Sequence, residues 1–247
     1  MRKQGAEYES MALGPAERGD GGGGVFVTPD GAGVAANSPR RNAVGRGWLL
    51  VVALAAAVGA VSFLSNITSD EQLSGQADVV LAARWSLSLI VNAGAVWAAL
   101  SVAAGYRARS RWAAVVSGAA APTLALVVHY GAGVVTGWIG AATWSGDNLM
   151  WFAAAVLLGP FLGLIGHAAR RPTGAGMAAA LVAPAGAVLQ PVIMGTLRWD
   201  GSVPWPNALA GLVSSIVLIV AGVTGVCALA RIRLSRPSSP SPGCVSK

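Results

Sequence analysis

The chain has 247 residues, of which 54% are hydrophobic and only 11% are charged. A water-soluble domain carries about 25% charged residues, so this composition excludes an ordinary soluble fold and favours a membrane protein. The net charge is +7, but the basic residues are spread over separate short segments and form no basic face, which argues against a nucleic-acid partner.

The amino-terminal segment is polar and rich in glycine, and no hydrophobic period runs through it. Residues 1–43 include an unbroken glycine run from Gly21 to Gly24. Such a segment buries too little apolar surface to offset its conformational entropy. We therefore expect residues 1–43 to form a disordered cytoplasmic tail, followed by a transmembrane domain over residues 44–232.

Six apolar stretches follow, and each is long enough for a transmembrane helix, which needs about 17–25 residues. The predicted fold class is therefore all-α, a polytopic bundle of six transmembrane spans. The spans are expected at about 48–64, 86–106, 113–135, 149–169, 175–195 and 208–230. Residues 233–247 are rich in serine and proline, and we expect them to form a second disordered cytoplasmic tail.

Basic residues mark one side of this arrangement. All of the 17 Lys and Arg except Arg84 and Arg198 fall on the side that holds the amino-terminal tail. Because cytoplasmic loops carry an excess of Lys and Arg, this distribution predicts that both termini are cytoplasmic. The bias towards Ala, Gly and Arg fits a GC-rich bacterial genome. The expected location is the bacterial plasma membrane, with the lipid bilayer as the main partner.

Catalytic motifs are missing from the sequence. No Asp or Glu lies deep in a predicted span, and the chain has no H-E-x-x-H, P-loop or G-x-S-x-G pattern. The two cysteines, Cys227 and Cys244, have no metal-binding spacing. We therefore expect no catalytic residue, no cofactor and no metal site, and an intramembrane enzyme is the least favoured function.

Three polar residues lie at a similar depth in different spans. Asn92, His129 and Gln190 are five or six residues from the outer ends of spans two, three and five, or roughly 8–9 Å below the boundary. Arg84 lies just above that level. Intramembrane polar groups favour a functional site, so these four residues could line a pocket open to the outside. Alternatively, each could simply hydrogen-bond a neighbouring helix, which stabilises a membrane protein by about 0.6 kcal/mol on average.

Prolines and glycines mark further features of the spans. Four prolines interrupt three consecutive spans, and each removes a backbone donor, which predicts a helix kink or a substrate site at a broken helix. These prolines are Pro122, Pro160, Pro184 and Pro191. Gly159 and Gly163 have the G-x-x-x-G spacing, which most often indicates packing between helices of one chain and less often a dimer face.

A scattered set of residues near helix ends, mostly glycine, tryptophan and arginine, carries a resemblance. They are Asn92, Gly94, Trp97, Gly105, Arg107, Trp151, Gly159, Pro160 and Gly163. Through them, residues 86–195 resemble a family of small actinobacterial integral membrane proteins that is catalogued only as a domain of unknown function. The resemblance implies a helical membrane domain and carries over no catalytic or binding residue. The tails of this chain are longer than those of the compact family form.

Two functions from different classes follow from these observations. The first is a non-enzymatic membrane scaffold, or an accessory subunit that binds a membrane-protein partner or a second copy of itself. It is favoured by the missing catalytic groups and by the small residues on the helix faces. The alternative is a small permease or channel that uses the outer polar residues and the proline-containing spans.

Overall fold

The computed structural model describes residues 38–140, 146–199 and 201–235. The two predicted tails lie outside the described residues, apart from their ends next to the membrane domain. There the first helix already begins at Ser38 and the last ends at Leu234, so each helix extends slightly into its predicted tail. The described residues from 40 onwards form one compact unit, and the packing described below lies within it.

The described residues contain helices and no strand, as the predicted all-α fold class requires. A 3₁₀ turn, Gly146–Asn148, directly precedes the sixth helix. The helices are α1 (Ser38–Asn66), α2 (Asp70–Leu73), α3 (Asp78–Val91), α4 (Gly94–Arg107), α5 (Arg111–Val135), α6 (Leu149–Ala168), α7 (Gly174–Ile193) and α8 (Trp205–Leu234).

Five of these helices are long and apolar enough to cross a membrane. They are α1 over Gly47–Asn66, the whole of α5, α6 and α7, and α8 over Trp205–Arg233. Helices α3 and α4 pass the same test only together, because a bend of 41° separates them. The described residues therefore form a helical bundle with five helices able to span a membrane, or six if α3 and α4 form one broken span.

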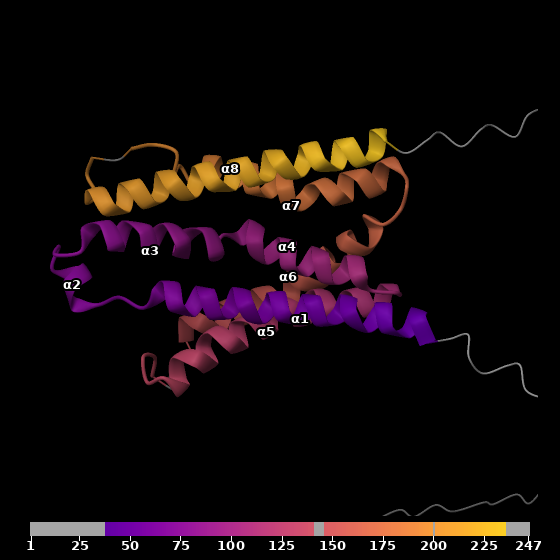
Figure 1. Ribbon diagram of the computed structural model, residues 1–247, viewed down its shortest axis with the longest axis horizontal. Helices are drawn as coiled ribbons and strands as arrows, with labels where there is room; N and C mark the ends of the chain where they lie inside the picture. The colour runs from indigo at the N-terminus through magenta and orange to yellow at the C-terminus, as the bar shows by residue number, and fades with distance from the viewer. Residues whose placement is uncertain (1–37, 141–145, 200, 236–247) are drawn as a thin grey trace, which may run out of the picture. The chain divides into compact units, whose positions relative to one another are not determined.

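The second predicted span differs most from the structure. A continuous helix was expected over residues 86–106, whereas α3 begins at Asp78 and the helix breaks at Asn92 and Ala93 (Figure 1). Ala93 has an extended backbone, with φ −61° and ψ 133°. No proline lies at this break, so the proline-based prediction of helix interruptions did not find it.

The prolines predicted to interrupt spans lie inside continuous helices. Pro122 is within α5, Pro160 within α6, and Pro184 and Pro191 within α7. None of them ends its helix. Since Pro122 has no N–H, the carbonyl of Gly118, four residues earlier, lacks its usual helical partner.

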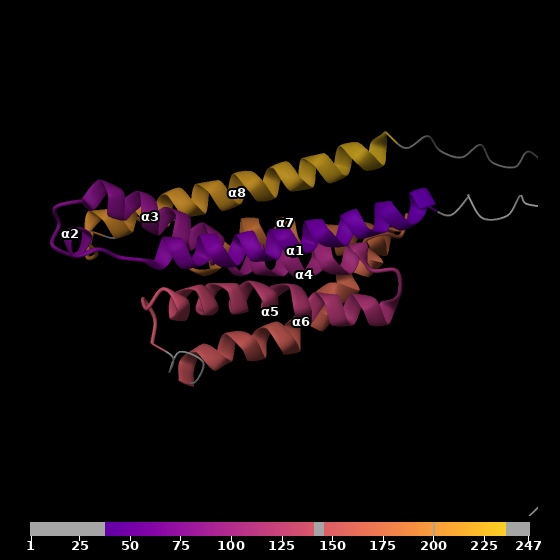
Figure 2. The ribbon, with the colours of Figure 1, turned by 60° about the horizontal axis from the view of Figure 1, so that its bottom comes forward.

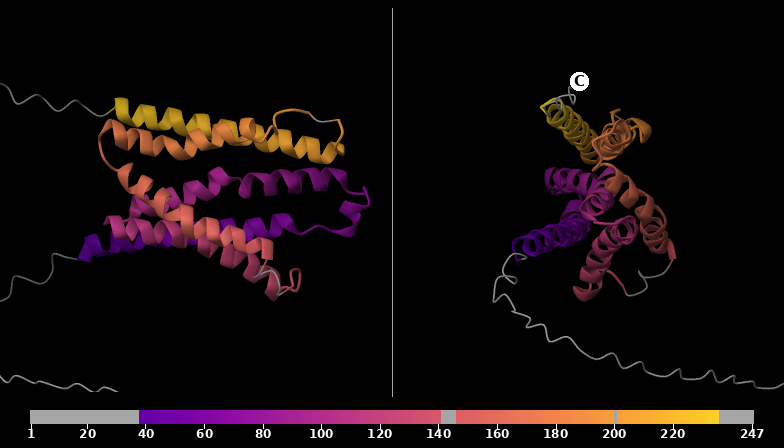
Figure 3. Two further views of the ribbon diagram at one scale, coloured as in Figure 1. Left: turned by 180° about the vertical axis from the view of Figure 1, so that it is seen from behind. Right: turned by 90° about the vertical axis from the view of Figure 1, so that its right-hand side faces the viewer.

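Helix α4 is central in the packing and contacts α5, α6 and α7. Figure 2 shows α5 and α6 on one side of α4 and α8 on the other. Helix α1 packs against α4 and α5 through a buried apolar cluster that includes Ala55, Leu100 and Ala125. Helices α7 and α8 form a second close pair, seen end-on in Figure 3, and α8 also packs on α3.

Glycines allow α4, α5 and α6 to approach with their backbones in contact. A Cβ atom on Gly163 would meet the backbone of Ala114 and Gly118, and one on Gly159 would meet Gly118 and Ala119. The backbone of Gly163 likewise leaves no room for a side chain at Gly105 on α4. The G-x-x-x-G pair of α6 is therefore an internal packing surface of this chain. In particular, Gly159 packs on the carbonyl that Pro122 leaves without an N–H partner.

The arginine-bearing helix ends lie together at one end of the unit. Gly47, near the start of α1, lies beside Arg107 at the end of α4. Arg170 Nη1 donates to the carbonyl of Ala108, 2.6 Å away, which joins the end of α6 to the α4–α5 turn. Arg233 Nη2 on α8 donates to the carbonyl of Arg171, 3.1 Å away. We call this the arginine end.

Candidate functional site

The break between α3 and α4 creates backbone groups that need partners inside the bundle. A helix end leaves its last carbonyls and first N–H groups without intrahelical partners. Here the indole Nε1 of Trp97 donates to the carbonyl of Val91 over 3.1 Å and so caps the end of α3. The side-chain oxygen of Gln190, on α7, accepts the N–H of Ala95 over 2.9 Å and caps the start of α4. The break is thus held by side chains that lie far away in the sequence or across the break.

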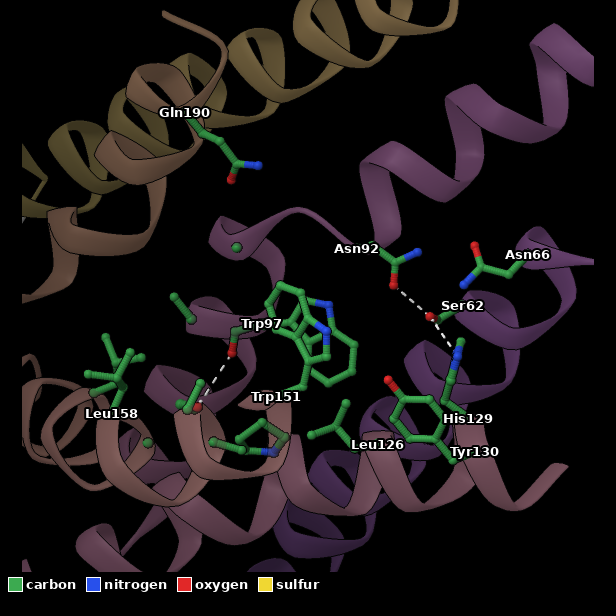
Figure 4. Close-up of a pocket in the computed structure, with 18 of the residues that line it drawn as sticks. Ser62, Asn66, Asn92, Trp97, Leu126, His129, Tyr130, Trp151, Leu158 and Gln190 are labelled. Atoms are coloured by element: carbon green, nitrogen blue, oxygen red, sulfur yellow. Dashed lines mark hydrogen bonds between the residues drawn. The ribbon is translucent and has the colours of Figure 1, made fainter. Parts of the chain in front are cut away.

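A hydrogen-bonded cluster lies beside this break and joins three helical segments. The Oγ of Ser62 on α1 donates to Oδ1 of Asn92 at 2.6 Å, and it lies 2.8 Å from Nδ1 of His129 on α5 (Figure 4). The amide oxygen can only accept, and a serine has only one hydroxyl proton. His129 must therefore donate from Nδ1 to Ser62, which leaves Nε2 of the neutral ring as an acceptor. We call Ser62, Asn92 and His129 the polar cluster.

The polar cluster continues towards the end of α1. Asn92 Nδ2 donates to Oγ of Ser88 at 3.2 Å, and Ser88 Oγ donates to Oδ1 of Asn66 at 2.6 Å. Ser62 and Asn66 are four residues apart on α1, as are Ser88 and Asn92 at the end of α3. Residues at this spacing share one face of a helix. Two polar helix faces therefore meet and form a hydrogen-bonded chain that ends at His129.

Two aromatic rings pack against the imidazole of His129. The rings of Phe63 and Tyr130 lie edge-on to the imidazole, with centroid distances of 6.3 Å and 4.7 Å. Tyr130 is anchored in turn, because its hydroxyl donates to Oδ1 of Asn148 at 3.0 Å. Since His129 is only 8% exposed, its ring is held firmly in this orientation.

A cavity of about 600 Å³ adjoins the polar cluster. Helices α1, α4, α5, α6 and α7 and the α3–α4 break all contribute to its wall, which is mainly apolar. Its lining includes both predicted polar groups and side chains that were not singled out from the sequence. These residues are Ser62, Asn66, Asn92, Gly94, Trp97, Ala98, Ser101, Pro122, Leu126, His129, Tyr130, Trp151, Ala154, Ala155, Leu158, Gly159, Leu162, Gln190 and Met194.

The cavity has a polar, buried region and an apolar, open region. Ser62 is 1% exposed and His129 8%, whereas Leu158 on α6 and Met194 on α7 are 59% and 68% exposed. Figure 4 shows Gln190 on one side and Ser62 and His129 on the other. The open region is therefore bordered by α6 and α7, and the polar cluster forms the opposite wall.

Three of the four residues predicted to share a pocket line this cavity, namely Asn92, His129 and Gln190. Arg84 is not among the lining residues. Its Nη1 donates to the carbonyl of Ser65 at 2.9 Å, and its Nε and Nη2 are buried without a hydrogen-bond partner. Arg84 is eight residues from Asn92, or about 12 Å along a helix, and its side chain reaches the end of α1 instead.

Sequence reasoning missed Ser62, Ser88 and the two cavity tryptophans, Trp97 and Trp151. The four-residue spacing of Ser62 to Asn66 and of Ser88 to Asn92 is a usable signal, because it places two polar side chains on one helix face. Trp151 lies at the start of a predicted span, like other tryptophans at span ends, whereas Trp97 lies in the middle of the predicted span 86–106, which is a signal that could have singled it out. Among the described residues, no group of three or more His, Cys, Asp or Glu could hold a metal ion.

Comparison with models of known protein families, with curated proteins and with solved structures gives no match for this chain. The resemblance to the actinobacterial membrane family therefore stays a prediction.

Proposed function

We propose that the protein is a small membrane permease that binds its substrate in the cavity beside the α3–α4 break. One observation carries this proposal: Asn92, His129 and Gln190 come from three separate segments and line one cavity of about 600 Å³. Ligand sites are mostly apolar cavities of about 300–1,000 Å³ with a few converging polar groups. Broken helices, like the α3–α4 pair, also frame substrate sites in known transporters.

The proposal includes a six-span topology in the plasma membrane, with both termini in the cytoplasm. Its support is the arginine end, where the start of α1 and the end of α8 lie together with the α4–α5 and α6–α7 turns. These segments share one end if α3 and α4 cross the membrane as one broken span. The excess of arginine then marks that end as cytoplasmic.

In this orientation the cavity lies in the outer half of the membrane domain. Ser62 is four residues from the end of α1, His129 is six from the end of α5, and Trp151 is near the start of α6. All three positions are far from the arginine end. The cavity is therefore expected to be reached from the outside of the cell.

The structure removes one support for the scaffold function. Exposed small-residue faces favoured a partner-binding helix surface, but Gly159 and Gly163 pack against α5 inside the chain. An intramembrane hydrolase is also disfavoured. Catalysis by Ser62 needs a base to accept its proton, yet Ser62 donates to Asn92, and Nδ1 of His129 already carries a proton. We propose binding without a chemical step.

A cysteine pair on α6 tests whether the cavity is open to water. Ala154 lines the cavity, whereas the neighbouring Ala153 is exposed on another face of the helix and does not line it. Each is replaced by cysteine in a background carrying Cys227→Ser and Cys244→Ser. Intact cells are then treated with a charged, membrane-impermeant methanethiosulfonate reagent. A thiol is modified as the thiolate, which forms in water but not in lipid.

We expect Ala154→Cys to be modified from outside and Ala153→Cys to stay unmodified. Modification of both variants, or of neither, would contradict an outward-open cavity. Modification of Ala154→Cys only in inverted vesicles would reverse the proposed orientation.

A further inference from the structure

The lining of the cavity restricts the class of molecule that fits it. We infer that the ligand is an uncharged, flat and largely apolar molecule that carries a group able to donate and accept hydrogen bonds. This inference rests on the proposed function, since it names the substrate class of the same cavity. Three properties of the wall support it.

The first property is charge. Among the described residues that line the cavity there is no Asp, Glu, Lys or Arg. Arg84, the nearest candidate from the sequence, is bonded to the carbonyl of Ser65 instead. A charged ligand would lose its hydration without meeting a counterion, and burial of an unpaired charge is strongly unfavourable. The described wall therefore offers neither an anion nor a cation a counterion.

The second property is the pair of indoles, Trp97 and Trp151, which both line the cavity (Figure 4). The N–H of Trp97 is already bonded to Val91, so what remains for a ligand is its apolar ring. Leu126, Leu158 and other apolar side chains complete this region. Aromatic rings gain additional stabilisation of about 0.5–1.5 kcal/mol when they pair with another ring, which favours a flat ligand.

The third property is the set of hydrogen-bonding groups that remain free. Gln190 uses its oxygen to cap Ala95, and no described residue bonds its amide nitrogen, which can donate to a ligand. His129 donates through Nδ1 to Ser62, so Nε2 of the neutral ring is an acceptor. A ligand that offers both an acceptor and a donor, such as a primary carboxamide, matches these two groups.

The open side of the cavity agrees with an apolar ligand. Leu158 on α6 and Met194, the residue that follows the end of α7, border the cavity and are mostly exposed. Trp151, at 55% exposure, lies on the same helix as Leu158. A lipophilic molecule that has partitioned into the bilayer meets no polar barrier at this border.

A matched series of four probes tests the inference on the purified full-length protein in nanodiscs. Tritiated naphthalene-2-carboxamide is the reference probe, because it is flat and neutral and both donates and accepts hydrogen bonds. Naphthalene-2-carboxylate, 2-naphthylmethylammonium and the saturated decahydronaphthalene-2-carboxamide compete against it. Empty nanodiscs measure partition into lipid, and only saturable binding above that background counts.

We expect saturable binding of the neutral aromatic amide. The two charged analogues should compete at least tenfold more weakly, because each would bury an unpaired charge. The saturated amide should compete about three- to tenfold more weakly, because it loses its aromatic contact with the indoles.

A tryptophan pair locates the binding. Trp151 lines the cavity and has no hydrogen bond among the described residues, whereas the similarly exposed Trp138 does not line it. Trp151→Leu should lower the affinity for the neutral amide about three- to tenfold, whereas Trp138→Leu should leave that affinity within about twofold of the unchanged protein.

Several results would overturn this inference. The neutral amide could fail to bind saturably up to its solubility limit. A charged analogue could bind as tightly as the amide or more tightly. The two tryptophan variants could also change the affinity for the amide equally. If Ala154→Cys is still modified from outside in such a case, the cavity remains the proposed site and only the ligand class is wrong. If Ala154→Cys is not modified, the proposed function fails independently.

Discussion

Ser62 and His129 are 67 residues apart in the sequence and are joined by a buried hydrogen bond of 2.8 Å between Oγ and Nδ1. The same hydroxyl reaches Asn92 at 2.6 Å, so one serine ties α1, the α3–α4 break and α5 together. This small residue, one turn from the end of an apolar helix, therefore organises the polar wall of the cavity.

Replacing Ser62 by alanine should destabilise the protein more than its small size suggests. Ser62→Ala leaves Asn92 and His129 without their shared partner, and a buried unsatisfied group costs about 1–3 kcal/mol. Unfolding in mixed micelles with increasing SDS measures the loss. Ser117 is a matched control, since its hydroxyl bonds only the carbonyl of Ala114 in its own helix. Ser117→Ala should change the free energy of unfolding by no more than about 0.5 kcal/mol. Equal losses of unfolding free energy in the two variants would contradict the stabilising role of the polar cluster.

A methyl group at Gly163 should separate α5 from α6. A Cβ at this position would meet the backbone of Ala114 and Gly118, so neither neighbour can yield by a simple rotamer change. Overpacking of this kind costs about 1–3 kcal/mol, and we expect Gly163→Ala to lower the melting temperature in detergent. Gly186 on α7 has open space around an added Cβ. Gly186→Ala should therefore leave the stability of the protein unchanged or raise it by up to about 1 kcal/mol. If Gly186→Ala lowered the melting temperature as much as Gly163→Ala, close packing at Gly163 would not explain the loss.

The cap that Gln190 provides for α4 should be visible in hydrogen exchange. Gln190→Met keeps the length of the side chain but removes the oxygen that accepts the N–H of Ala95. Loss of one hydrogen bond, about 1 kcal/mol, should speed exchange of this amide about three- to tenfold. Mass spectrometry of a peptide spanning residues 93–97 provides the measurement. Met194→Leu, one turn further along α7, should leave the exchange unchanged.

Removal of the charge at Arg84 should not destabilise the protein. Two of its guanidinium nitrogens are buried without partners, and only Nη1 makes a hydrogen bond. Replacing a poorly satisfied buried charge by an apolar side chain of similar length is often neutral or favourable. We expect Arg84→Met to leave the free energy of unfolding unchanged or to raise it by up to about 1 kcal/mol. A loss above about 2 kcal/mol would show that an anion bound in solution satisfies the guanidinium.

The spanning helices were predictable because lipid imposes a long apolar stretch and the sequence displays it directly. The α3–α4 break was not predictable in the same way. Proline is the usual marker of an interrupted helix, yet the helices continue through all four prolines and break at Asn92 and Ala93, where there is none. The contacts that stabilise the break come from Trp97 and Gln190, and only the folded chain brings them to it.

The candidate site was also predictable only in part. Depth along a helix follows from residue spacing, which is why Asn92, His129 and Gln190 could be placed at one level before the fold was known. The neighbour that a long side chain reaches does not follow from depth, and Arg84 bonds the carbonyl of Ser65 at the end of α1 and does not line the cavity. Ser62 was missed because a serine within an apolar span differs little in hydropathy from its neighbours.

The glycine contacts also determine which parts of the protein can move. Backbones in direct contact cannot slide without collision, so α4, α5 and α6 behave as one body. Helices α7 and α8 form another, because Gly222 lies against the backbone of Pro184. The Gln190–Ala95 hydrogen bond crosses from one body to the other next to the cavity. A rocking motion of α7 and α8 against the other helices would have to break this bond, together with the packing of α8 on α3.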